Sequence, residues 1–81
     1  MARYFFHLRD DLDVRDEEGV ELRSADAARS YAVINARDIM CGTLQREGRI
    51  TLHHRIGVED EQGALVITVP FSDAVSVESE G

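Results

Sequence analysis

The chain has 81 residues, of which 43% are hydrophobic and 31% are charged, a balance typical of one small folded domain and not of a disordered chain. Its formal net charge of −7 disfavours nucleic acid as a partner, because such binding depends on neutralising phosphates. The single cysteine excludes an internal disulfide framework, and no apolar run reaches signal-peptide or membrane-spanning length, so we expect a cytoplasmic protein with no membrane contact.

A strand is predicted close to the N-terminus, where side chains alternate between apolar and mixed character. The side chains expected on its buried face are Tyr4, Phe6 and Leu8. The aspartates within residues 10–13 end this strand, because aspartate favours turns through its own side-chain hydrogen bonds. Gly19–Leu22 is then either a short second strand or a loop.

A long helix follows, with Ser24 as the residue that caps its N-terminus and Gly48 as its C-terminal stop. Small and apolar residues recur in it at helical spacing, which predicts a narrow stripe that lies close to a sheet. The stripe consists of Ala28, Ala32, Ala36, Ile39 and Thr43.

Two further strands are predicted after the helix. The first has Ile50, Leu52, His54, Ile56 and Val58 on one face, and a hairpin turn at residues 59–63 leads to the second. The returning apolar face consists of Leu65, Ile67, Val69 and Phe71. We expect one domain over residues 1–71 and a frayed acidic tail over residues 72–81.

This order of elements predicts an α+β fold: a two-layer sandwich in which a single long helix covers one face of a small antiparallel sheet. Only the second strand is in doubt in the predicted order of strand, short strand, helix, strand, strand.

Several short motifs resemble those of a known family. They are Arg3-Tyr4-Phe5-Phe6, the segment from Asp16 to Leu22, the alanine-rich start of the helix, and the acidic turn at residues 59–63. In combination they are similar to those of short bacterial proteins known only as a domain of unknown function. The resemblance implies a stand-alone domain and carries over no activity, cofactor or catalytic residue.

Three groups of side chains invite a chemical role and lack the spacing for one. A calcium loop that starts at Asp11 has Arg15 and Asp16 where a ligand and a glycine are needed. His53 and His54 point to opposite faces of a strand, so either could pair with His7 but not with the other. We predict that His54 is buried and hydrogen-bonded, and that Cys41 packs as a small hydrophobic residue. No metal, cofactor or catalytic residue is therefore predicted.

The sequence favours a small non-enzymatic protein-interaction module that acts as a homodimer, because one copy has a marginal core and apolar residues beyond one helix face. The candidate interface residues are Val33, Ile34, Met40 and Leu44. The alternative is an antitoxin-like or RNA-associated regulator, in which Arg3, Arg9 and Arg55 form a basic strip across neighbouring strands.

Overall fold

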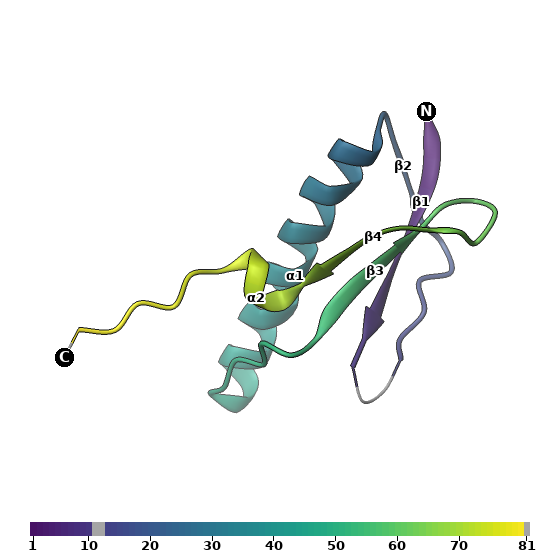
Figure 1. The fold of residues 1–81 in the computed structure, drawn as a ribbon. Coiled ribbons are helices and arrows are strands. Elements are labelled where there is room, and N and C mark those ends of the chain that lie inside the picture. The colour runs from purple at the N-terminus through teal and green to yellow at the C-terminus, as the bar shows by residue number, and fades with distance from the viewer. Residues whose placement is uncertain (11–12, 81) are drawn as a thin grey trace.

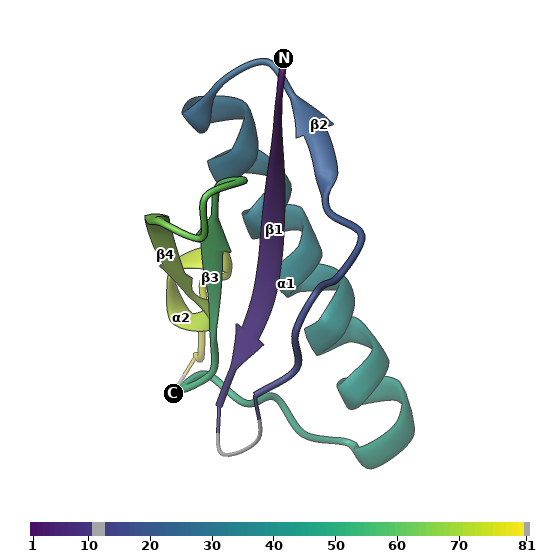
Figure 2. The same ribbon diagram turned by 90° about the vertical axis from the view of Figure 1, so that its right-hand side faces the viewer.

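The computed structural model describes residues 1–10 and 13–80, and it confirms the predicted α+β fold (Figure 1). The elements follow in the order β1 (Ala2–Arg9), β2 (Val20–Leu22), α1 (Ala25–Glu47), β3 (Arg55–Glu59), β4 (Leu65–Pro70) and α2 (Phe71–Ala74). Within the described residues the strands form one antiparallel sheet in the order β2-β1-β3-β4. The turned view in Figure 2 shows α1 running across a single face of this sheet.

β1 is a central strand, paired with β2 along one edge and with β3 along the other. Phe6 lies opposite Val58 and Leu8 lies opposite Ile56, so the apolar faces of β1 and β3 coincide under the helix. The predicted burial of Tyr4 and Phe6 is confirmed. Side chains alternate along a strand, so the other side chains of β1 and β3 lie on the opposite face of the sheet. No helix among residues 1–10 and 13–80 covers that face, which is called the helix-free face below.

Both predicted ends of α1 are confirmed. The Ser24 hydroxyl accepts a hydrogen bond of 3.1 Å from the Ala27 amide, and Gly48 ends the helix in the left-handed conformation with φ of 69°. The predicted stripe is fully buried at Ala28, Ala32 and Ala36. Its small side chains let the helix backbone lie close to the sheet.

The strand predicted to begin at Ile50 is wrong in its first half, because β3 begins only at Arg55. Arg55 pairs with Arg9 at the end of β1 and with Pro70 at the end of β4. Residues 50–54 therefore run past the ends of both neighbouring strands, and Ile50 and Leu52 are exposed instead of sharing the core face.

The hairpin between β3 and β4 has the predicted turn, with Gly63 at φ of 79°. The returning face differs from the prediction at Leu65, which is 64% exposed. A register shift between Val58 and Glu59 places Leu65 opposite Glu59, on the helix-free face. Ile67 and Val69 pack on the core side as expected.

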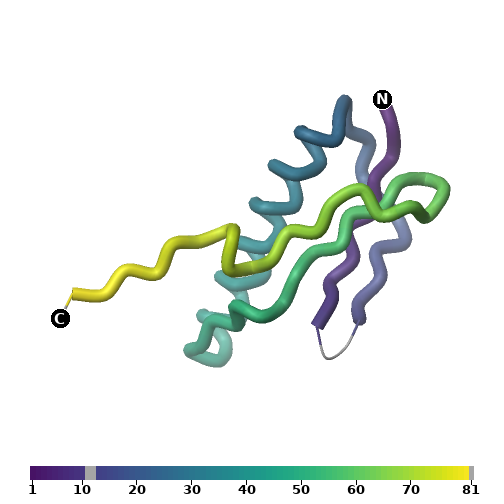
Figure 3. The backbone as a smooth tube through the Cα atoms, viewed as in Figure 1, coloured from purple at the N-terminus to yellow at the C-terminus, as the bar shows by residue number. Residues whose placement is uncertain are grey.

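The hydrophobic core includes residues beyond Phe71, the residue at which the sequence predicts the end of the domain. Phe71 and Ala74 are buried in the single turn of α2, and Val75 packs against the core. α2 lies against α1, and the remaining residues up to Glu80 run away from the body of the molecule, as the tube in Figure 3 shows. Val75 and these remaining residues, 75–80 together, are called the C-terminal tail below.

Candidate functional site

An apolar groove lies beside the C-terminal half of α1 and has a volume of about 260 Å³. Its lining comes from three separate parts of the chain: one side of α1, the loop after it, and the start of the C-terminal tail. The lining residues are Arg37, Met40, Cys41, Leu44, Ile50 and Val75. Leu44 is 47% exposed and Ile50 is also exposed, so the groove is open to a partner.

The charged group of the groove is the guanidinium of Arg37. Its Nε donates a hydrogen bond of 2.7 Å to the carbonyl oxygen of Ala74, which anchors the side chain between α1 and α2. No carboxylate among residues 1–10 and 13–80 lies within ion-pair distance of this guanidinium. The groove therefore combines an apolar floor with one fixed positive charge.

The four predicted interface residues divide between the core and the surface. Met40 is only 5% exposed and belongs to the core, although part of it lines the groove. Val33 is partly buried against the core, whereas Ile34 is 57% exposed and does not line the groove. Leu44 is the one of the four that is exposed and also lines the groove.

Sequence reasoning missed four groove residues, which are Arg37, Cys41, Ile50 and Val75. Cys41 is exposed, and the prediction that it packs as a hydrophobic residue is wrong. Ile50 and Val75 lie on either side of the hairpin in sequence, and only the return of the chain to α1 brings them together. No local spacing could have indicated this contact.

A second unusual feature is His7, which is only 1% exposed although it lies on the helix-free face. Its Nδ1 accepts a hydrogen bond of 3.0 Å from the main-chain amide of Asp16, and its Nε2 lies 3.3 Å from the Oε1 of Glu59. Because an amide nitrogen can only donate, Nδ1 carries no proton and Nε2–H must be the donor to Glu59. Glu59 also binds Arg9 at 3.2 Å, which completes a partly buried polar chain across the sheet.

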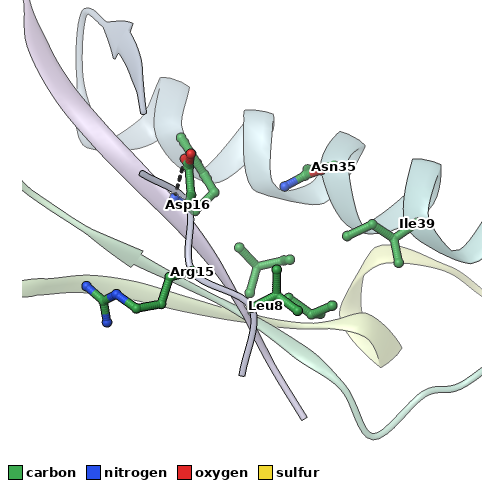
Figure 4. Close-up of a pocket in the computed structure, with 8 residues that line it drawn as sticks. Leu8, Arg15, Asp16, Asn35 and Ile39 are labelled. Atoms are coloured by element: carbon green, nitrogen blue, oxygen red, sulfur yellow. Dashed lines mark hydrogen bonds between the residues drawn. The ribbon is translucent and has the colours of Figure 1, made fainter. Parts of the chain in front are cut away.

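The Asp16 carboxylate organises the chain between β1 and β2. It accepts hydrogen bonds of 3.1 Å from the amides of Phe6, Glu18 and Gly19, and the bond to Phe6 replaces strand pairing where β2 is missing (Figure 4). Burial raises the pKa of this carboxyl, but the three amide donors outweigh burial and lower the pKa below its ordinary value of 3.8. The arrangement is structural, because each carboxylate oxygen is already occupied.

A cavity of about 320 Å³ lies beneath this segment, between α1 and the sheet. Figure 4 shows that Asn35 and Ile39 from α1 and Leu8 from β1 surround it, whereas the side chain of Arg15 points away. The lining is mostly apolar, and the Asp16 carboxylate at its rim is committed to main-chain amides. It offers no pair of groups for acid–base or nucleophilic chemistry.

A further cavity of about 370 Å³ lies on the helix-free face, beside His7 and between residues 15–17 and the β3–β4 turn. It is rich in carboxylates, but most of these carboxylates already accept hydrogen bonds from main-chain amides. Asp60 accepts from the amides of Gln62 and Ala64, and Glu61 accepts from the amide of Arg3. These bonds hold the turn in place and leave no convergent acidic centre.

Metal binding finds no support in the part of the chain that the structure describes, where no group of three or more His, Cys, Asp or Glu is placed to hold an ion. The calcium loop considered above begins at Asp11, which lies outside the described residues. The predicted burial of His54 is wrong, because the side chain is only partly buried, and its Nε2 lies 3.3 Å from a carboxylate oxygen of Asp10. His7 faces Gly57 and not a histidine.

The basic strip considered for RNA is largely neutralised. Arg3 lies 4.0 Å from a carboxylate oxygen of Glu21, and Arg9 binds both Asp13 and Glu59. Arg55 is exposed at the start of β3. An arginine that is already paired offers little to a phosphate backbone.

The comparisons with known proteins agree with the motifs found in the sequence. No curated protein and no solved structure matches the chain. Among residues 1–10 and 13–80, no helix has the length and apolar character needed to cross a membrane. The sequence model of one family, described as Domain of unknown function (DUF6894), matches residues 3–72. This match covers the sheet, α1 and the hairpin, and the chain therefore belongs to that family of unknown function.

Proposed function

We propose that this chain is a small non-enzymatic protein-interaction module, and that it acts as a homodimer joined through the groove beside α1. The observation that carries the proposal is the groove itself: an open apolar surface with exposed Leu44 and Ile50 and one fixed positive charge. A chain of 81 residues gains proportionally more than a larger one from burying such a surface, because its own core is small.

The polar features elsewhere support a binding role over a catalytic one. His7 and Asp16 have their side-chain groups committed to structural hydrogen bonds, as the site geometry describes. Among the described residues, every buried side-chain nitrogen and oxygen atom has a hydrogen-bond partner. A catalytic centre normally holds, in a cleft, a polar or titratable group that structural hydrogen bonds do not fully satisfy. The full set of hydrogen-bond partners therefore favours an interaction module.

The test is the oligomeric state in solution, measured by sedimentation velocity over a wide range of protein concentration. We expect the wild type to dimerise reversibly and the Leu44→Asp variant to dissociate at least about 100-fold more readily, because a carboxylate in an apolar contact is costly. Ile34→Asp is the matched control, since it adds the same charge to α1 at an exposed position outside the groove.

Helix content by circular dichroism shows whether each variant is folded. A wild type that stays monomeric at every concentration would reject the homodimer. Equal dissociation by the two variants would place the interface elsewhere on α1, and the groove proposal would then be rejected.

A further inference from the structure

The C-terminal tail begins inside the groove and then leaves the molecule. Val75 lines the groove in an extended conformation, with φ of −138° and ψ of 161°. Val77, two residues on, is 70% exposed, and the tail runs away from the body of its own chain (Figures 1 and 3). In an extended segment residues two apart share one side, so the two valines form one apolar edge. Val75 lies in the groove, whereas Val77 is exposed to solvent.

The charges of the tail complement the charge of the groove. Val77 is followed by Glu78 and Glu80, whereas the groove presents Arg37, for which no carboxylate partner exists among residues 1–10 and 13–80. The bond from its Nε to Ala74 leaves the two terminal nitrogens of the guanidinium for a carboxylate, a geometry that suits bidentate binding.

We propose that the tail of a second copy of this chain occupies the groove, with Val77 on the apolar floor and a glutamate of the same tail on Arg37. The contact is reciprocal, because a two-fold dimer lets each copy donate its tail and receive the other. This inference rests on the proposed homodimer and names the segment that forms it.

The tail of the same copy is a poor occupant for its own groove. Val75 already occupies part of the groove, and the residues after it run away from the body of the molecule, so Val77 of the same copy would reach the groove floor only if the chain turned back directly after Val75. Residues 72–80 contain neither glycine nor proline, the residues that make the tightest turns easy. A second copy requires no such reversal.

Proximity can be measured with the native thiol of Cys41, which lines the groove and is exposed. In a Val77→Cys variant, mild oxidation should form a disulfide between residues 41 and 77 of different copies. Mass spectrometry identifies the link, and non-reducing electrophoresis separates a covalent dimer from a monomer. Gln62→Cys, in the exposed turn at the other end of β4, controls for chance collision.

A 41–77 link within a monomer would overturn the second copy as occupant. If the 41–77 disulfide forms no faster than the 41–62 disulfide of the control, the tail does not occupy the groove and the inference is rejected. A dimer-sized product with the 41–77 link, formed at least about tenfold faster than the control, is the expected result, because a seated segment has a high effective concentration.

Charge reversal separates this inference from the homodimer itself. Arg37→Glu alone, or Glu78→Arg with Glu80→Arg, should weaken the dimer at least about tenfold, and an equimolar mixture should recover it because both exchanged contacts are then complementary. If Leu44→Asp dissociates the dimer while deletion of residues 76–81 does not, the homodimer stands and the tail inference fails. A monomeric wild type without a 41–77 link would reject both.

Discussion

Replacing Asp16 by asparagine should destabilise the fold far more than its partly exposed position indicates. The isosteric change turns one carboxylate oxygen into an NH₂ group that cannot accept a hydrogen bond. The oxygen that binds Phe6 and the oxygen that binds Glu18 and Gly19 are different atoms, Oδ2 and Oδ1. Whichever way the amide is oriented, it opposes a donor to a main-chain donor and loses the charge that strengthens the remaining bonds.

The expected cost follows from these bonds. A hydrogen bond to a charged group contributes about 1.5–3 kcal/mol, and the bonds to Glu18 and Gly19 compete with water because they lie near the surface. We therefore expect a loss of about 2–4 kcal/mol in the free energy of unfolding. A domain of this size has a total stability of roughly 4–12 kcal/mol, so the expected loss is a substantial part of the total.

Urea denaturation followed by circular dichroism measures this loss, with Glu17→Gln as the control. That substitution removes the same charge from the neighbouring exposed residue and should change the free energy of unfolding by less than about 0.5 kcal/mol. A loss below about 1 kcal/mol for Asp16→Asn, or equal losses for both variants, would refute the role given to the three amide bonds.

The same carboxylate predicts how stability depends on pH. The folded state lowers the pKa of Asp16 below 3.8, so its contribution is fully present above the unfolded value and is lost as the pH falls through the folded value. The difference between wild type and Asp16→Asn should therefore be constant near neutrality and shrink below about pH 4. A difference that grows on acidification would contradict the sign.

Three further outcomes follow from the structure. Gly19→Ala should lower the free energy of unfolding by about 2–4 kcal/mol, because φ is 72° and a Cβ would lie within 2.9 Å of three neighbouring atoms. Gly63→Ala places its Cβ in open space and should lower it by about 1 kcal/mol. Urea denaturation measures both, and equal losses would refute the crowding at Gly19. Long-range proton–nitrogen NMR should find His7 protonated on Nε2 at neutral pH, and an Nδ1–H form would contradict the bond from the main chain. Met40→Ala should lower the free energy of unfolding by about 2–4 kcal/mol, because Met40 is buried, and Ile34→Ala by less than about 0.5 kcal/mol, because Ile34 is exposed. Similar losses for the two variants would refute the burial of Met40.

The sequence by itself determined the features that depend on near neighbours. Ser24 and Gly48 were predicted as the ends of α1 because a cap acts on amides and carbonyls within one turn. Gly63 was predicted in the hairpin because the turn needs a positive φ. The alternation of β1 and the small stripe of α1 together predicted the two-layer fold, and the motifs predicted the family.

Only the tertiary structure decided where strands end and which surfaces meet. β3 starts at Arg55 because its two partners stop there, which depends on residues far away in the chain. The burial of His7 depends on Asp16 and Glu59, which reach it from a loop and from a neighbouring strand. Local periodicity reports which side chains share a face, but it carries no information about what covers that face. The groove beside α1 combines α1 and the loop after it with Val75, which is distant in sequence, and for that reason only the folded chain defines it.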